Sequence, residues 1–274
     1  TADNNTAFGY NSLGENTTGT RNIAIGAYAL DANTTQSDNT AVGYNAIGAA
    51  NAGGQLTAVG GYALSDNTTA NRSTAFGYYA GKAITTGDDN CAFGASALDA
   101  CTTGGYNIAI GSHALGKSNG TQNVAIGYYA LEENTTGGYN TACGSEALTN
   151  ATTADGNTAV GYYASKANTS GNLNVSVGYK ALATNTVGDR NVAIGYQALE
   201  TYNPSSNEDG YNTGVGLNAL QATTTGNNNT AVGGKAMELN TTGSYNCAFG
   251  VFALDNNTTG SNSTAIGYDA LSTN

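Results

Sequence analysis

Side chains capable of acid–base, nucleophilic or metal chemistry are few and scattered in this sequence. It contains one histidine, His113, and four cysteines, Cys91, Cys101, Cys143 and Cys247, with no C-x-x-C pair. Zinc and iron sites need closely spaced Cys and His ligands, and a nucleophilic Ser or Cys needs a neighbouring base. The sequence shows neither pattern. We therefore expect no catalytic residue, no metal site, no cofactor and no enzyme activity.

Aromatic side chains are the one group whose spacing suggests binding. An aromatic residue often stands two positions after a recurring glycine, where other copies carry variable polar residues. Rings at a variable, outward position suit stacking on sugar rings. The alternative, which we favour, is packing, because tyrosine also suits a half-buried pleated surface. The candidate binding residues are Tyr28, Tyr62, Tyr79, Tyr129, Tyr163 and Phe252.

These residues belong to a repeat that occurs sixteen times. Thirteen of the fifteen steps between its central glycines are 17 residues long, and the other two are 16 and 21. A period this short and strict indicates that each repeat is one coil of backbone and that the coils stack. The central glycines are Gly9, Gly26, Gly43, Gly60, Gly77, Gly94, Gly111, Gly127, Gly144, Gly161, Gly178, Gly195, Gly216, Gly233, Gly250 and Gly267.

We number the positions of a repeat as slots, with the glycine at slot 0. Slots −3 to −1 alternate large, tiny and large side chains, as in Ile23-Ala24-Ile25, and this alternation predicts a strand. Slot −1 is always apolar, so we expect it to be buried. The alanine at slot −2 must meet something at short range, either the far wall of a narrow coil or a neighbouring chain.

The other slots predict the rest of the coil. Asparagine at slot −4, as in Asn22, should form an amide ladder from coil to coil. The glycine should mark a bend with positive φ. Alanine and leucine at slots +3 and +4, as in Ala29-Leu30, should supply the opposite wall, and the Asn-Thr-Thr-Gly segment should form a tight corner.

Together these features predict an all-β fold, a parallel β-solenoid or β-roll of about 16 coils. We expect one repeat domain over residues 1–274, with a loop insertion at 201–212 where the long step lies. At about 4.8 Å per coil the rod would be roughly 75 Å long. Its core would be thin, so we expect several chains to bundle along the alanine-lined face.

The cysteines and the corners allow two further expectations. Cys91, Cys143 and Cys247 occupy slots that other repeats fill with Thr or aliphatic residues, and we expect all four cysteines, Cys101 included, to be small buried hydrophobes. A disulfide between Cys91 and Cys101 across one coil is the alternative. The Asn-Thr-Thr corners match the acceptor pattern for N-linked glycans.

Composition excludes two classes of partner. Charged residues make up 10% of the chain, the net charge is −11, and the eight Lys and Arg residues are spread singly. Without a basic patch we expect no nucleic-acid binding. No apolar run reaches 18 residues, so we expect no membrane insertion.

The repeat NTAxGYxALxxNTTG resembles the β-roll repeats of trimeric autotransporter adhesin heads, which are also called YadA-like. Its seventeen-residue length is more similar to the longer repeats of phage tail-fibre proteins. The resemblance covers residues 5–274. It implies a left-handed β-roll, three identical chains around one axis, and attachment to a surface.

On this resemblance we expect a structural fibre or adhesin segment of a longer protein, located outside the cell as a virion tail fibre or a cell-surface appendage. It would mediate attachment to a cell surface, with copies of itself as partners and cell-surface glycans as candidate ligands. One alternative is a self-assembling extracellular filament that reads no specific ligand. A second is an ice-binding solenoid, which we disfavour because the Thr-Thr pairs lie at corners.

Overall fold

The computed structural model describes residues 2–49 and 53–272, which contain strands and turns but no helix. The chain divides into two compact units, residues 1–137 and 138–274. Each unit is a parallel β-solenoid with one strand per coil, which confirms the predicted fold class. The two units are built alike and are described separately.

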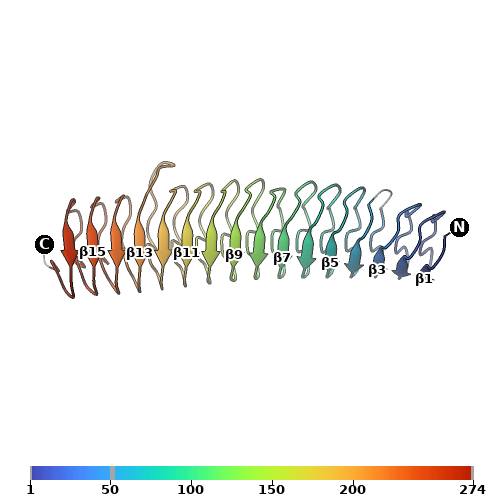
Figure 1. The fold of residues 1–274 in the computed structure, drawn as a ribbon, viewed down its shortest axis with the longest axis horizontal. Coiled ribbons are helices and arrows are strands. Elements are labelled where there is room, and N and C mark those ends of the chain that lie inside the picture. The colour runs from blue at the N-terminus through green and yellow to red at the C-terminus, as the bar shows by residue number, and fades with distance from the viewer. Residues whose placement is uncertain (1, 50–52, 273–274) are drawn as a thin grey trace. The chain divides into compact units, whose positions relative to one another are not determined.

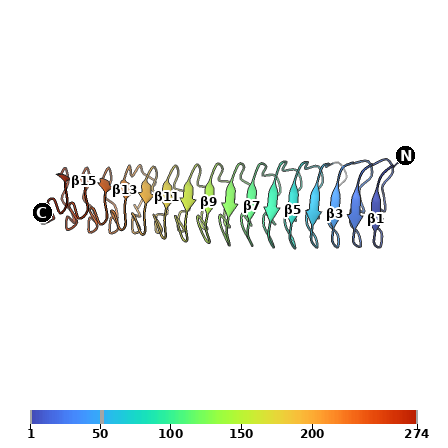
Figure 2. The same ribbon diagram turned by 60° about the horizontal axis from the view of Figure 1, so that its bottom comes forward.

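The first unit has eight strands in sheet order along the chain, each paired in parallel with the next. Figure 2 shows them side by side, with the rest of each coil returning behind the sheet. The strands are β1 (Thr6–Phe8), β2 (Ile23–Ile25), β3 (Thr40–Val42), β4 (Thr57–Val59), β5 (Thr74–Phe76), β6 (Cys91–Phe93), β7 (Ile108–Ile110) and β8 (Val124–Ile126).

The second unit repeats this arrangement with eight more strands (Figure 1). Every pair is in slot register, so that Ala159 lies opposite Ser176 and Ser176 opposite Ala193. The strands are β9 (Thr141–Cys143), β10 (Thr158–Val160), β11 (Val175–Val177), β12 (Val192–Ile194), β13 (Thr213–Val215), β14 (Thr230–Val232), β15 (Cys247–Phe249) and β16 (Thr264–Ile266).

The glycine bend after each strand is confirmed, and the turn that follows it uses left-handed backbone at residues other than glycine. Gly26 has φ 130°, and Tyr28 and Leu30 have φ 59° and 51°. A left-handed non-glycine residue costs roughly 1–2 kcal/mol. Full burial of a leucine contributes about 1.5–3 kcal/mol, and the Leu30 N–H also donates to Ala46 O (3.1 Å) in the next coil. Burial and this hydrogen bond therefore offset the strain.

The core of each coil is made of slots −2, +3 and +4. The side chain at slot −1, which we expected to be buried, points outward instead. Ala24 is fully buried, whereas Ile25 and Ile110 are 39% and 41% exposed. The coil is too narrow for a large side chain opposite its leucine wall, because a Cβ at Gly214 would already lie 3.1 Å from Ala219 O. The prediction that slot −1 is buried was wrong.

The same geometry corrects the proposed bundling surface. The alanines of slot −2 line the inside of the coil, where they meet its far wall, and not an outer face. Chains therefore cannot bundle along them. Slots −3 and −1 are the outward side of the strands instead.

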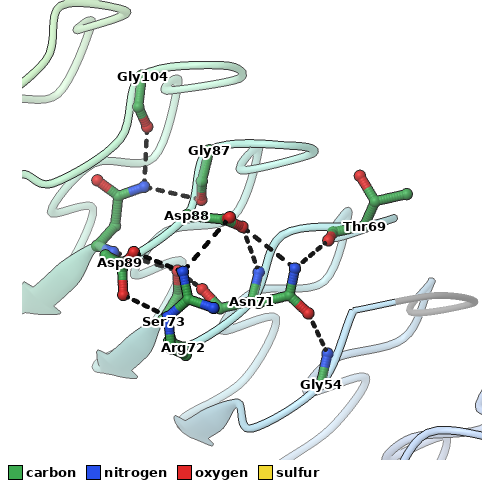
Figure 3. Close-up of polar contacts among 10 residues, drawn as sticks. Gly54, Thr69, Asn71, Arg72, Ser73, Gly87, Asp88, Asp89 and Gly104 are labelled. Atoms are coloured by element: carbon green, nitrogen blue, oxygen red, sulfur yellow. Dashed lines mark hydrogen bonds and ion pairs between the residues drawn. The ribbon is translucent and has the colours of Figure 1, made fainter.

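Buried asparagines form the predicted amide ladder within each unit. Asn174 Nδ2 donates to Gly188 O (2.9 Å), and its Oδ1 accepts from the Asn191 backbone N–H (2.9 Å). In the first unit the carbonyls of Gly87 and Gly104 both accept from the amide of Asn90 (Figure 3). These bonds satisfy buried backbone groups at the corners and hold each coil in register with the next.

The long step forms a corner between β12 and β13, visible as the tan loop that stands out beside β13 in Figure 1. Tyr202, near the start of this segment, is fully buried, and its hydroxyl donates to Asn227 Oδ1 (2.8 Å). A short parallel bridge joins Asp189 to Asp209. The segment 201–212 is thus anchored to the coils on both sides of it.

Candidate binding surfaces

One mostly apolar surface of each unit is the outer side of its strands, which we name the sheet face and define as slots −3 and −1. In all sixteen strands these two slots hold only Thr, Ile, Val, Cys and Phe. Phe76 and Phe93 stack there with ring centroids 4.8 Å apart. An exposed apolar surface of this extent, without a charge, is typical of an interaction surface.

Tyrosines at slots +1 and +2 form a second surface, which we name the ring ladder. In the first unit Tyr10, Tyr28, Tyr44, Tyr62 and Tyr78 alternate between the two slots and pack edge to face. Their centroids are 5.4, 5.9, 5.2 and 6.3 Å apart in succession. In the second unit Tyr162, Tyr179 and Tyr196 stack nearly parallel, at 5.7 and 5.1 Å.

The six predicted binding residues are all half-buried and all contact another ring, so they do not form one site. Tyr163, for example, stacks on Tyr162 at 3.8 Å, and the Lys166 ammonium lies 3.9 Å from its ring centroid. Tyr28 and Tyr62 pack inside the ring ladder, and Phe252 packs on Tyr268. The more exposed rings are at slot +1, such as Tyr44 and Tyr78. Packing therefore accounts for much of the aromatic pattern, and sugar binding at these six residues stays a prediction.

All eight Lys and Arg side chains lie within 4 Å of a carboxylate. Most pairs join neighbouring coils, as Arg72 does when its Nε donates to Asp89 Oδ1 at 2.7 Å (Figure 3). This guanidinium holds the pKa of Asp89 below its ordinary value. Exposed pairs of this kind add little stability, but they leave no Lys or Arg side chain unpaired to bind an anionic ligand.

The four thiols are free, so the alternative of a Cys91–Cys101 disulfide is contradicted. Only Cys101 is a buried hydrophobe, because Cys91, Cys143 and Cys247 lie on the outward side of their strands. Successive side chains of a strand point to opposite sides, so the alanine at slot −2 points inward and the cysteines at slots −3 and −1 point outward. Our expectation of burial was wrong for these three.

Cys101 should be the least reactive thiol. Burial raises its pKa to about 11, so at pH 8 only roughly one molecule in a thousand carries the thiolate that reacts. We expect an alkylating reagent to leave Cys101 unmodified in the folded protein and to modify it in denaturant, as located by peptide mass spectrometry. Equal modification rates in the two states would contradict the buried position.

Most Asn-Thr-Thr corners present their threonines and bury their asparagines. Asn33, Asn67, Asn134 and Asn240 are fully buried, and so is Asn168 of the related Asn-Thr-Ser corner. Asn168 Nδ2, for example, donates to Gly171 O at 2.8 Å, and its Oδ1 accepts from the Gly171 N–H at 2.8 Å. A glycan on such an amide would require the coil to open. The acceptor pattern therefore marks a corner of the fold.

Among residues 2–49 and 53–272, no three His, Cys, Asp or Glu side chains come together in a way that could hold a metal ion. Over the same ranges there is no helix of the length and apolarity that a membrane span requires. No protein-family model matches the chain, and no curated protein matches it either.

Proposed function

We propose that this chain is a structural segment of an extracellular or virion surface fibre that attaches to a cell surface. Copies of the chain would assemble through the sheet face, three around one axis, as the resemblance to adhesin heads implies. The observation that carries this proposal is the sheet face itself, which is uncharged, mostly apolar, and repeats coil after coil within each unit.

The sheet face favours a second copy of the chain over an unrelated partner. Its rows recur once per coil, about 4.8 Å apart, and a partner that matches such rows needs the same repeat. The face carries no charge, and parallel copies therefore meet without like-charge repulsion. Association would also bury apolar area that a thin solenoid cannot bury alone.

Neighbouring substitutions on one strand test this proposal. Ile110→Asp places a carboxylate on the sheet face, so we expect it to leave the fold intact and to dissociate the assembly into 27.4 kDa chains. Ala109→Asp places the carboxylate inside the coil, where an unpaired charge costs about 3–5 kcal/mol, and we expect unfolding. Light scattering measures the mass, and circular dichroism measures the fold.

The unsubstituted chain should have three times the mass of one chain in the same measurement. A monomer in the unsubstituted protein, or an Ile110→Asp variant that stays assembled on dilution, would contradict assembly through the sheet face. Filaments of indefinite length would favour the alternative of a purely structural filament.

Ice binding is less well supported than fibre assembly. An ice-binding face needs threonine rows that run without interruption along a flat sheet. The outward threonines of slot −3 run over three successive coils at most, at Thr40, Thr57 and Thr74. The absence of thermal hysteresis in the purified protein would exclude this alternative.

A further inference from the structure

The ring ladder of the first unit is interrupted at one coil. At slots +1 and +2 the coil of Gly94 carries Ala95 and Ser96, and neither has a ring. The coil before it carries Tyr78 and Tyr79, and the coil after it carries Ser112 and His113. One coil without rings therefore separates the ring of Tyr79 from the ring of His113.

The rings on either side of this gap have their partners on the far side. Tyr79 packs on Tyr62 and Tyr78 at 5.3 and 4.0 Å. The ammonium of Lys82 lies 5.7 Å from the Tyr79 ring centroid and pairs with the carboxylate of Asp66. Asp66 and Tyr62 both belong to the Gly60 coil, on the side away from the gap. Across the gap, His113 stacks on Tyr129 at 5.0 Å, away from Ser96.

Backbone hydrogen bonds fix the width of the gap. The Ser96 N–H donates to Tyr78 O (2.9 Å), and the His113 N–H donates to Ala95 O (3.1 Å). The three coils are thus stacked in register, and two steps of about 4.8 Å separate Tyr79 from His113 by roughly 9.6 Å. Rings in contact prefer centroids about 4.5–7 Å apart. The spacing of the two coils thus leaves room for one ring-sized group between the two side chains.

We propose that Ala95 and Ser96 are the floor of a binding site for one neutral pyranose ring, held between Tyr79 and His113. The electron-rich faces of aromatic rings attract the C–H groups of a sugar ring. Ser96, in the ring-free coil, and Ser112, in the next coil, carry hydroxyls that would bond sugar hydroxyls. Every Lys and Arg is already paired with a carboxylate, which favours a neutral sugar over a sialylated or sulfated one.

This site would deepen the proposed attachment function, on which its biological meaning rests. No pocket occurs among the described residues, so the sugar would bind on an open surface with a Kd of about 1 mM or weaker. Several identical chains in one fibre would present the site together, and avidity would raise the strength of attachment.

The single histidine makes the test direct, because His113 alone gives imidazole signals in a ¹H–¹³C spectrum. The probes are methyl β-D-glucopyranoside, methyl β-D-galactopyranoside and methyl α-D-mannopyranoside, titrated into the full chain. We expect at least one of them to move the His113 signals saturably.

Filling the gap should abolish that response. Ser96→Tyr restores the ring ladder, and the left-handed backbone at this slot already accepts tyrosine, since Ser96 and Tyr79 have φ 54° and 60°. We expect the variant to fold and to lose affinity at least about tenfold. Asn218→Tyr, at the same slot of the second unit with φ 54°, is the matched control and should bind as the unsubstituted chain does.

Three outcomes would overturn the sugar site: no response to any of the three pyranosides, an equal response in Ser96→Tyr, or a response only to N-acetyltyrosinamide. The last would assign the gap to an aromatic side chain of a protein partner. The mass of the assembly, measured on the same samples, reports separately on the proposed fibre. An intact trimer without a sugar response would contradict the sugar site and leave the proposed fibre standing.

Discussion

Replacing Gly233 with alanine should destabilise the second unit by about 4 kcal/mol, whereas the same change at the adjacent Gly234 should have almost no effect. Gly233 has φ 139°, and a Cβ there would lie 2.5 Å from the carbonyl oxygen of Gly250 in the next coil. Gly234 has open space at its Cβ position, and other repeats already carry alanine at this slot, as at Ala27 and Ala95.

Two costs add at Gly233. Backbone in a region reserved for glycine costs an L-residue about 1–3 kcal/mol, and forced overlap in a packed interior costs about 1–3 kcal/mol more. The clash is with backbone that is held on both sides by the sheet, so neither coil can move away from it. For a unit of this size the melting temperature should fall by roughly 10–15 °C.

Thermal unfolding followed by circular dichroism measures both variants against the unsubstituted chain. Because coils contact only their neighbours, the loss should begin around the coil of Gly233, and hydrogen exchange of β13, β14 and β15 should report it first. Equal melting temperatures for the two variants would show that the central glycine is not required for close approach between coils.

The strands, the glycine bend and the corners could all be predicted from the sequence, because a strict repeat shows which residue types recur at each slot. The direction in which the strand faces could not be derived from alternation alone. Ala24 and Ile25 alternate equally well with either one inside. The decisive signal was size, since a wall built from Leu30 leaves room only for alanine opposite.

Two other features gave no sequence signal. Leucine is not a residue that predicts left-handed backbone, yet Leu30 adopts it, because the tight turn and its buried side chain require it. The ring ladder also escaped prediction, because it depends on slots +1 and +2 of successive coils taken together. Slot +2 alone contains Tyr28 and Tyr62. Tyr44, whose ring lies between theirs, occupies slot +1 and was therefore not among the predicted binding residues.

Asn174→Asp should destabilise the second unit by about 3 kcal/mol at pH 7, and the loss should shrink as the pH falls. Asn174 is buried, and its Nδ2 donates to Gly188 O (2.9 Å) and to Asn157 Oδ1 (3.2 Å). An aspartate keeps the bonds that the Oδ1 accepts, but it turns a second oxygen toward two acceptors. Burial and these acceptors both disfavour the carboxylate, so its pKa must rise above the value of about 3.9 in the unfolded chain.

The pH dependence follows from that direction. A carboxyl whose pKa is raised by folding binds its proton more tightly in the folded state, so the variant is most stable below pH 4. It loses that stability as the pH rises through the folded pKa. A loss of about 3 kcal/mol corresponds to a shift of roughly two pKa units. The protonated acid can also donate to Gly188 O, as the amide does.

The Asn174→Ser variant distinguishes the effect of the carboxylate charge on stability from the effect of losing the amide. Serine already occupies this slot at Ser73, where its Oγ accepts from the Asn90 N–H at 3.3 Å. Asn174→Ser should therefore cost about 1–2 kcal/mol, equally at pH 4 and pH 8, in denaturant titrations referenced to the unsubstituted chain at each pH. If the aspartate variant instead shows the same deficit at both values, the amide ladder is open to water at this coil. Its asparagines would then hold the coils in register without being sealed inside them.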